Sequence, residues 1–279
     1  MKEICLEDLS CPVRVAKIFS ISIRIFRSSI FGYLLLSLMV YLPLLLMKQL
    51  GRPEFASLIE LIHGSFLDML VFLTLPTLII YKKVYPIGTI RIFLQRFFAS
   101  AVILALLQLS LNYIGGLGFL FSIFILFSGC FLVIENSPKI VNIKSCLMQS
   151  FTIVRKYFFQ VIWNFLAITI IITVPASLFA LWYFYGHREF WETIHALDSV
   201  QEHNTVTVRQ LLETSLELAQ EPKFLLGRVV LHIVFRPLKS IFMAVLFISI
   251  MQLVDPTRIG NFLSIRSRNA STASPTEGS

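Results

Sequence analysis

Charged residues are scarce in this chain. Asp, Glu, Lys and Arg together make up 14% of its 279 residues, whereas hydrophobic residues make up 56%. The mean hydropathy is +0.79, and a soluble domain of this length cannot bury so much apolar surface. The composition therefore argues against a soluble all-helical protein and predicts an integral membrane protein.

Cysteine is also rare, and nothing in the sequence pairs the few that occur. Cys5, Cys11, Cys130 and Cys146 form no C-x-x-C motif and have no His at ligand spacing. We therefore expect neither a structural disulfide nor a zinc site.

A catalytic constellation is lacking as well. The segment "HGSFLD" brings His63, Ser65 and Asp68 close together in the sequence. A catalytic triad is a spatial arrangement, however, and no exposed nucleophile turn accompanies these residues. We expect no enzyme activity and no cofactor.

One segment has a spacing that occurs in metal sites. In "EFWETIH", Glu192 and His195 are three residues apart, with His187 and His203 nearby. A di-iron bundle needs several such pairs inside spanning helices, whereas this pair lies in a predicted loop. We interpret it as a solvated amphipathic face and expect no metal.

Long apolar runs are what the sequence does have. Six of them suffice for a helix that crosses about 30 Å of hydrocarbon, which takes about 20 residues. The glycines of "NYIGGLG" fit a tight turn between the third and fourth runs. The predicted fold class is an all-α integral membrane protein, a bundle of about six transmembrane helices with basic amphipathic juxtamembrane helices. The runs are about 29–47, 66–81, 97–115, 117–134, 158–182 and 236–254.

The distribution of Lys and Arg predicts the orientation. Bases gather before the first run and in the second and fourth connections, whereas the third connection has none and acids dominate the last. Because translocating positive charge is disfavoured, both termini should be cytoplasmic, and no cleavable signal is apparent. The predicted parts are a cytoplasmic leader (1–28), a six-span domain (29–257) with a cytoplasmic helix (about 137–156) and an outer loop (about 183–235), and a disordered cytoplasmic tail (258–279).

Basic, aromatic segments precede three of the runs. "IRIF" occurs at 23–26 and again at 90–93, and "SFTIVRKYFF" precedes the fifth run. Bases on one side of an otherwise apolar helix are typical of a helix that lies among anionic headgroups. Either the chain consists of three units, each a basic segment followed by two membrane helices, or "IRIF" recurs by chance. The candidate headgroup contacts are Arg14, Lys17, Arg24, Arg27, Arg91, Arg96, Arg155 and Lys156.

A basic stripe precedes the last run. Its residues are Arg228, His232, Arg236 and Lys239. At 100° per residue, spacings of four, four and three keep them within about 80° of arc. Either the stripe lies on the outer leaflet and its bases snorkel to headgroups, or it turns inward and binds an anion such as a lipid phosphate. In the second case a kink at Pro237 would widen the cavity, and Asp68 is the candidate counter-charge.

Two segments carry a resemblance to a known family. After Glu135, "ENSPKIVNIKSCLMQSFTIVRKYFF" has a Ser-Pro helix start, then Ser150, an aromatic residue and a basic pair. The segment "FRPLKSIFMAVLFISIMQLVDPTR" ends with Asp255 and Arg258. Together they resemble the glycerophosphoryl-diester phosphodiesterase membrane-domain family and its stand-alone bacterial relatives of unknown function.

The resemblance implies a six-helix domain in a bacterial inner membrane and implies no catalysis, since the activity of fused members belongs to a separate soluble domain. Three function classes stay open: a non-enzymatic scaffold or envelope-maintenance factor, a transporter or lipid-handling protein, and an intramembrane enzyme. Anionic membrane lipids are the expected partners, with a membrane-protein partner or a second copy of the chain as further possibilities. No nucleic acid is expected, because the bases cluster beside the membrane spans.

Overall fold

The computed structural model describes residues 14–50, 56–81, 83–135, 142–187, 191–192, 213, 218 and 221–271. Every regular element within these segments is a helix, which confirms the all-α class. Two compact units divide the chain: unit 1 comprises Met1–Ile168 and Arg236–Ser279, and unit 2 comprises Thr169–Phe235. The helices are α2 (Val15–Ser28), α3 (Ile30–Leu50), α4 (Ala56–Tyr81), α5 (Pro86–Arg96), α6 (Phe98–Tyr113), α7 (Gly116–Phe124), α8 (Ser128–Glu135), α9 (Ile143–Lys156), α10 (Phe158–Tyr185), α13 (Pro222–Val254) and α14 (Pro256–Ser271).

Two of the described helices are long and apolar enough to cross a membrane, Phe158–Tyr185 and Leu226–Val254. The number rises to four if each of two bent helix pairs counts as one span. These pairs are α2 with α3, bent by 87°, and α5 with α6, bent by 79°. The structure thus gives two to four candidate spans, and the count of six stays a prediction.

The fourth predicted run, 117–134, is divided into α7 and α8. A single side chain of α9 holds the break: the Ser150 hydroxyl donates to the Phe124 carbonyl at 2.8 Å and accepts from the Phe127 amide at 3.2 Å. Ser150 is fully buried. These bonds partner backbone groups that the interrupted helix leaves open, so the break is a specified feature of the fold.

Of the predicted glycines, Gly115 lies in the turn between α6 and α7, whereas Gly116 and Gly118 lie in the first residues of α7. Gly115 has a φ of 76°, in the region that favours glycine. A Cβ on Gly118 would lie 1.6 Å from the Leu111 carbonyl oxygen, so the two helices approach too closely there for any side chain. The prediction of a tight glycine turn is confirmed.

A basic helix, a one-residue break and an apolar helix recur three times in the chain. The break residues are Ser29, Phe97 and Tyr157. In each case the residue four positions later donates its amide to the carbonyl of the break residue. These donors are Tyr33, Ala101 and Val161, and all three are fully buried. The shared geometry supports the interpretation of the chain as three units.

The recurring letters "IRIF" do not coincide with this structural repeat. The residue four positions before each break is buried, and these residues are Ile25, Phe93 and Ile153. Ile25 is the third letter of the first "IRIF", whereas Phe93 is the fourth letter of the second. The two tetrapeptides are therefore shifted by one residue relative to their breaks. What repeats is the helix–break–helix structure, and the tetrapeptide sequence does not repeat in register with it.

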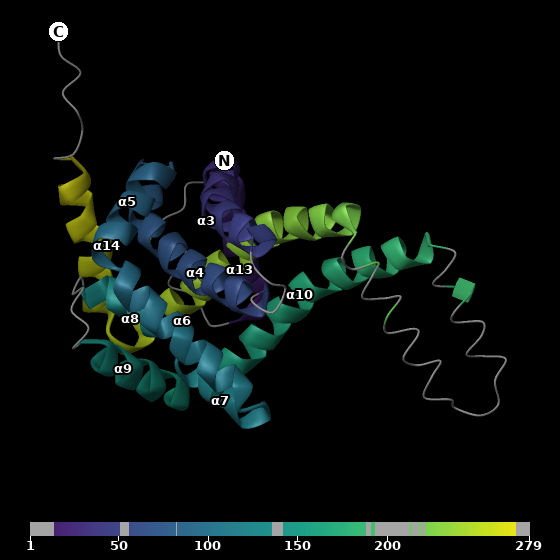
Figure 1. The fold of residues 1–279 in the computed structure, drawn as a ribbon. Coiled ribbons are helices and arrows are strands. Elements are labelled where there is room, and N and C mark those ends of the chain that lie inside the picture. The colour runs from purple at the N-terminus through teal and green to yellow at the C-terminus, as the bar shows by residue number, and fades with distance from the viewer. Residues whose placement is uncertain are drawn as a thin grey trace, which may run out of the picture. The chain divides into compact units, whose positions relative to one another are not determined.

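Aromatic rings fill the core of unit 1. The Phe247 ring of α13 lies 5.4 Å from Phe72 of α4 and 5.0 Å from Phe131 of α8, measured between centroids, and Phe72 stacks on Phe262 of α14 at 5.0 Å. Figure 1 shows α4 crossing this unit, and it contacts α3, α6, α8 and α14. The helices from different parts of the chain are thus held together around α4.

The last helices are longer than the apolar run and the tail suggest. Helix α13 begins at Pro222 and continues through Pro237, so the stripe from Arg228 to Lys239 lies on one helix, as its spacing assumed. Helix α14 continues to Ser271 where a disordered tail was expected from residue 258, and 272–279 lie outside the described residues. The predicted start of the cytoplasmic helix at Ser137 also lies outside them, and α9 begins at Ile143.

Each of the four longest helices that the structure describes has one proline in its interior. These residues are Pro43 in α3, Pro76 in α4, Pro175 in α10 and Pro237 in α13. Proline has no backbone N–H, so each helix lacks one of its i→i−4 hydrogen bonds.

Candidate functional site

Helices α4 and α13 bring polar residues together within unit 1. The Ser240 hydroxyl donates a hydrogen bond to Oδ1 of Asp68, although the two residues are 172 positions apart in the sequence. Arg236 and Lys239 lie close enough to act electrostatically on the Asp68 carboxylate. The side chain that the sequence offered as a counter-charge is therefore beside two bases of the stripe.

Both bases lie against neighbouring helices. A Cβ on Gly64 would be 3.2 Å from Nη1 of Arg236, so the missing side chain of Gly64 leaves room for the guanidinium. Gly64 precedes Asp68 by four residues, which places both on one face of α4. The Lys239 ammonium lies 5.3 Å from the centroid of the Phe165 ring, in the range of a cation–π contact. This geometry favours the inward interpretation of these two bases.

Bases outnumber acids at this site among the residues that the structure describes. Two bases, Arg236 and Lys239, act on one carboxylate, Asp68. Around them the helices are apolar, with Leu67 and Ile241 fully buried. Ionisable groups among apolar helices are costly and mark ligand or ion pathways by default, and a bound anion would balance this excess.

The other two stripe residues belong to unit 2. Arg228 and His232 lie in α13 before Arg236, and the structure places only Arg236 and Lys239 in unit 1 with Asp68. Sequence reasoning missed Ser240. The sequence does contain a signal for Ser240, because its hydroxyl follows the stripe base Lys239 and directly precedes the apolar run from Ile241.

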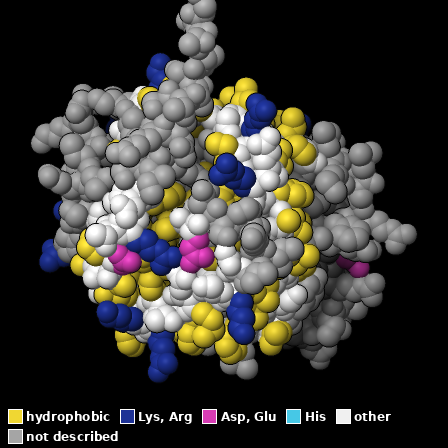
Figure 2. Space-filling view, turned by 90° about the vertical axis from the view of Figure 1, so that its left-hand side faces the viewer, with side chains coloured by type: hydrophobic (Ala, Val, Ile, Leu, Met, Phe, Trp, Pro, Cys, Tyr) yellow, Lys and Arg dark blue, Asp and Glu magenta, His cyan; other side chains and the backbone are white. Residues whose placement is uncertain are grey.

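The predicted headgroup contacts lie on the surface. Seven of the eight side chains are exposed, and Arg24 is partly exposed. Figure 2 shows the side of the molecule that is on the left in Figure 1, where dark blue bases are spread among yellow hydrophobic side chains. Phe31 and Phe159, each two residues after a break, are 84% and 83% exposed. A surface that exposes both bases and aromatic rings is typical of a bilayer interface.

The "HGSFLD" and "EFWETIH" segments, in which we expected neither catalysis nor a metal, are only partly described, and the side chain of His63 is outside the described part. Ser65 donates to Gln108 at 3.0 Å while Asp68 accepts from Ser240, so Ser65 and Asp68 have different partners. Among the residues that the structure describes, no group of three or more His, Cys, Asp or Glu side chains is placed to hold a metal. His195 and His203 lie outside those residues.

The cysteines that the structure describes are buried free thiols, Cys130 and Cys146. Burial next to the Glu135 carboxylate raises the pKa of Cys146 to about 12, so its thiol stays protonated at neutral pH. Cys146 is therefore a poor nucleophile. Cys5 and Cys11 lie outside the described part of the chain.

A second polar cluster joins the end of α8 and the start of α14 to the middle of α9 in unit 1. Arg258 of α14 donates to Glu135 of α8 through Nη2 and to Gln149 of α9 through Nη1, each at 2.9 Å. The Gln149 amide also donates to Glu135 at 2.6 Å. Glu135 and Arg258, which come from the two segments of the resemblance, thus form an ion pair across 123 positions.

No family model, curated protein or solved structure matches this chain. The resemblance to the membrane-domain family therefore stays a prediction, and functional inference rests on the residues themselves.

Proposed function

We propose that the chain is a non-enzymatic, multi-spanning membrane protein that binds the anionic headgroup of a lipid at Arg236 and Lys239. The observation that carries this proposal is the pair of bases beside one carboxylate among apolar helices. A scaffold needs no such pair of bases, whereas a phosphate is an acceptor for both of them. We therefore favour the lipid-handling class over a purely structural role.

The finer topology belongs to the same proposal. We place α3, α4, α6, the α7–α8 pair, α10 and α13 across a bacterial inner membrane, with both termini in the cytoplasm. Its support is the alternation of Lys and Arg between successive connections. In this topology α4 and α13 both run from the outer side inward. Asp68 and Lys239 are near the middle of their helices, so a lipid headgroup would be bound below the outer surface.

The test replaces Arg236 and Lys239 together with Gln. The protein is purified in detergent, the retained phospholipids are extracted and quantified by mass spectrometry, and the fold is followed by circular dichroism. The matched control replaces Lys83 and Lys144 with Gln, which removes the same charge from exposed positions outside the predicted headgroup contacts. We expect the site variant to lose anionic lipid while the control retains it. Equal retention by both variants would contradict the proposed site.

A further inference from the structure

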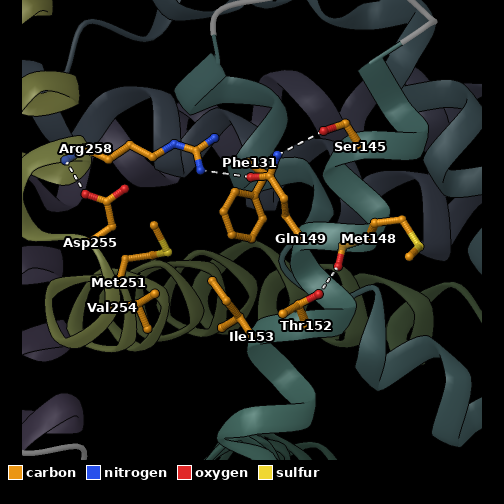
Figure 3. A pocket seen from close by; sticks show the side chains of 10 residues that line it. All are labelled: Phe131, Ser145, Met148, Gln149, Thr152, Ile153, Met251, Val254, Asp255 and Arg258. Carbon is orange, nitrogen blue, oxygen red and sulfur yellow. Dashed lines mark hydrogen bonds between the residues drawn. The ribbon is translucent and has the colours of Figure 1, made fainter.

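A groove opens between α9 and the corner at which α13 ends and α14 begins. Its volume is about 310 Å³, at the lower end of the range for small-molecule sites. The apolar part of its lining comprises Phe131, Met148, Ile153, Met251 and Val254. Figure 3 shows Met251, Val254 and Ile153 below Arg258 and Asp255, with Phe131 between Arg258 and Gln149, so charged groups at one end adjoin an apolar wall. Such a groove fits an amphiphile.

Asp255 supplies a negative charge at the polar end. Its Oδ1 accepts hydrogen bonds from the Arg258 amide at 3.1 Å and from the Thr257 hydroxyl at 2.9 Å. These bonds hold the pKa of the Asp255 carboxyl below its usual value, so the group is ionised at neutral pH. Both hydrogen bonds that the structure records within the described chain reach Oδ1, which leaves Oδ2 available to a ligand.

Arg258 supplies a positive charge beside it. Its bonds to Glu135 and Gln149 use two of the five N–H donors of a guanidinium. The same group lies 5.4 Å from the centroid of the Phe131 ring, which fixes it at the edge of the groove. The remaining donors suit a phosphate oxygen.

The net charge of the polar end of the groove indicates the class of ligand. Arg258 carries one positive charge, whereas Glu135 and Asp255 carry one negative charge each, so the polar end has a net charge of about −1 when all three are ionised. An anionic headgroup would meet this excess of negative charge. A zwitterionic headgroup offers a cation to Asp255 and a phosphate to Arg258.

We propose that the groove binds a phospholipid with a primary ammonium headgroup, its ammonium on Asp255, its phosphate on Arg258 and part of an acyl chain along Met251 and Ile153. This site is separate from the one at Arg236 and Lys239, and it has the opposite net charge. In the proposed topology it lies on the cytoplasmic side, where inner-leaflet lipid reaches it.

The first test titrates the detergent-purified protein with dioctanoyl phosphatidylethanolamine and with dioctanoyl phosphatidylglycerol, and counts bound lipid by native mass spectrometry. Thr152→Trp fills the groove, since Thr152 lines it and its hydroxyl bonds only within α9, to the Met148 carbonyl. Phe151→Trp adds an indole to the neighbouring position outside the groove. We expect the ethanolamine lipid to bind about tenfold more weakly to Thr152→Trp, and unchanged to Phe151→Trp.

The second test removes only the negative charge of Asp255. Asn caps a helix as well as Asp does, so Asp255→Asn keeps the start of α14. Loss of a charge-assisted hydrogen bond should reduce the preference for the ethanolamine lipid over the glycerol lipid about tenfold. Equal binding of the two lipids by the unmodified protein, or full binding by Thr152→Trp, would overturn the proposal. So would loss of binding in Phe151→Trp.

A third variant separates the two lipid sites. The Arg236→Gln, Lys239→Gln protein should bind the ethanolamine lipid as the unmodified protein does, because neither residue lines the groove. Loss of ethanolamine-lipid binding in this variant would contradict a separate groove site. If the proposed anion site at Arg236 and Lys239 does not exist, this variant is still expected to bind the ethanolamine lipid.

Discussion

At the scale of single residues, a few positions tolerate only the residue that occupies them. Ser150 makes two hydrogen bonds to the backbone between α7 and α8 while it is fully buried. Gly227 of α13 lies so close to Phe179 of α10, within unit 2, that a Cβ would be 2.1 Å from the ring. Both residues can be tested with small substitutions.

Ser150→Ala should lower the free energy of unfolding by about 1–3 kcal/mol, because the buried Phe127 amide and Phe124 carbonyl both lose their partner. The measurement is thermal unfolding in detergent followed by circular dichroism. Thr152→Ala serves as the control, because the exposed Thr152 hydroxyl bonds only within its own helix. A loss of stability no larger than that of the control would show that Ser150 does not hold the break.

Gly227→Ala should destabilise the protein by about 1–3 kcal/mol, since the Phe179 ring has to move to admit a methyl group. Gly260→Ala in α14 is the matched control, because a Cβ there meets nothing within 4 Å. Alanine has the higher helix propensity, so Gly260→Ala should be neutral or stabilise by up to about 1 kcal/mol. The melting temperatures of the two variants, each compared with that of the unmodified protein, test the prediction. A shift of the same sign in both variants would refute it.

At the scale of elements, the three basic helices before the breaks share their burial pattern and their exposed bases. The bends of 87° and 79° turn α2 and α5 away from the apolar helices that follow. A helix that lies along the bilayer surface before a spanning helix needs a bend near a right angle. The geometry thus suits helices that lie among headgroups.

Replacing Arg24, Arg27, Arg91 and Arg96 together with Gln should weaken insertion or scramble orientation, because each juxtamembrane base contributes about 1 kcal/mol near an anionic surface. Membrane fractionation and cysteine labelling measure the two effects. The same four positions changed to Lys keep the charge and should behave as the unmodified protein does. If the Gln variant inserts and orients normally, these bases are not headgroup contacts.

How well the sequence predicts a contact depends on how many residues separate the two partners along the chain. The spacing of Arg236 and Lys239 predicts a shared face, because a helix has a known period. Their meeting with Asp68, offered as a counter-charge, depends on how α4 packs on α13. The pairing of Arg258 with Glu135 has no local signal, since 123 positions separate the two residues. The "IRIF" recurrence misleads, because identical letters fall one residue out of register with the burial pattern.

At the scale of the whole molecule, the orientation in the membrane is the property that the other proposals depend on. Cysteine probes near Asp198 should be labelled in intact cells or spheroplasts, whereas probes near Lys139 should be labelled only after the membrane is broken. The reason is the excess of Lys and Arg in the connection that contains Lys139. Labelling with the opposite sidedness would reverse the topology and with it the leaflets assigned to the two lipid sites.

The interior proline of each of the four longest described helices has a consequence for hydration. The carbonyl groups of Met39, Phe72, Ile171 and Ile233, each four residues before a proline, cannot accept the usual helical N–H bond. In hydrocarbon an open carbonyl is costly and attracts any hydroxyl or water that reaches it. Ile233 precedes Arg236 by three residues. If a lipid phosphate binds at Arg236 as proposed, water that enters with it would meet a backbone acceptor on the same helix that an uninterrupted helix would not offer.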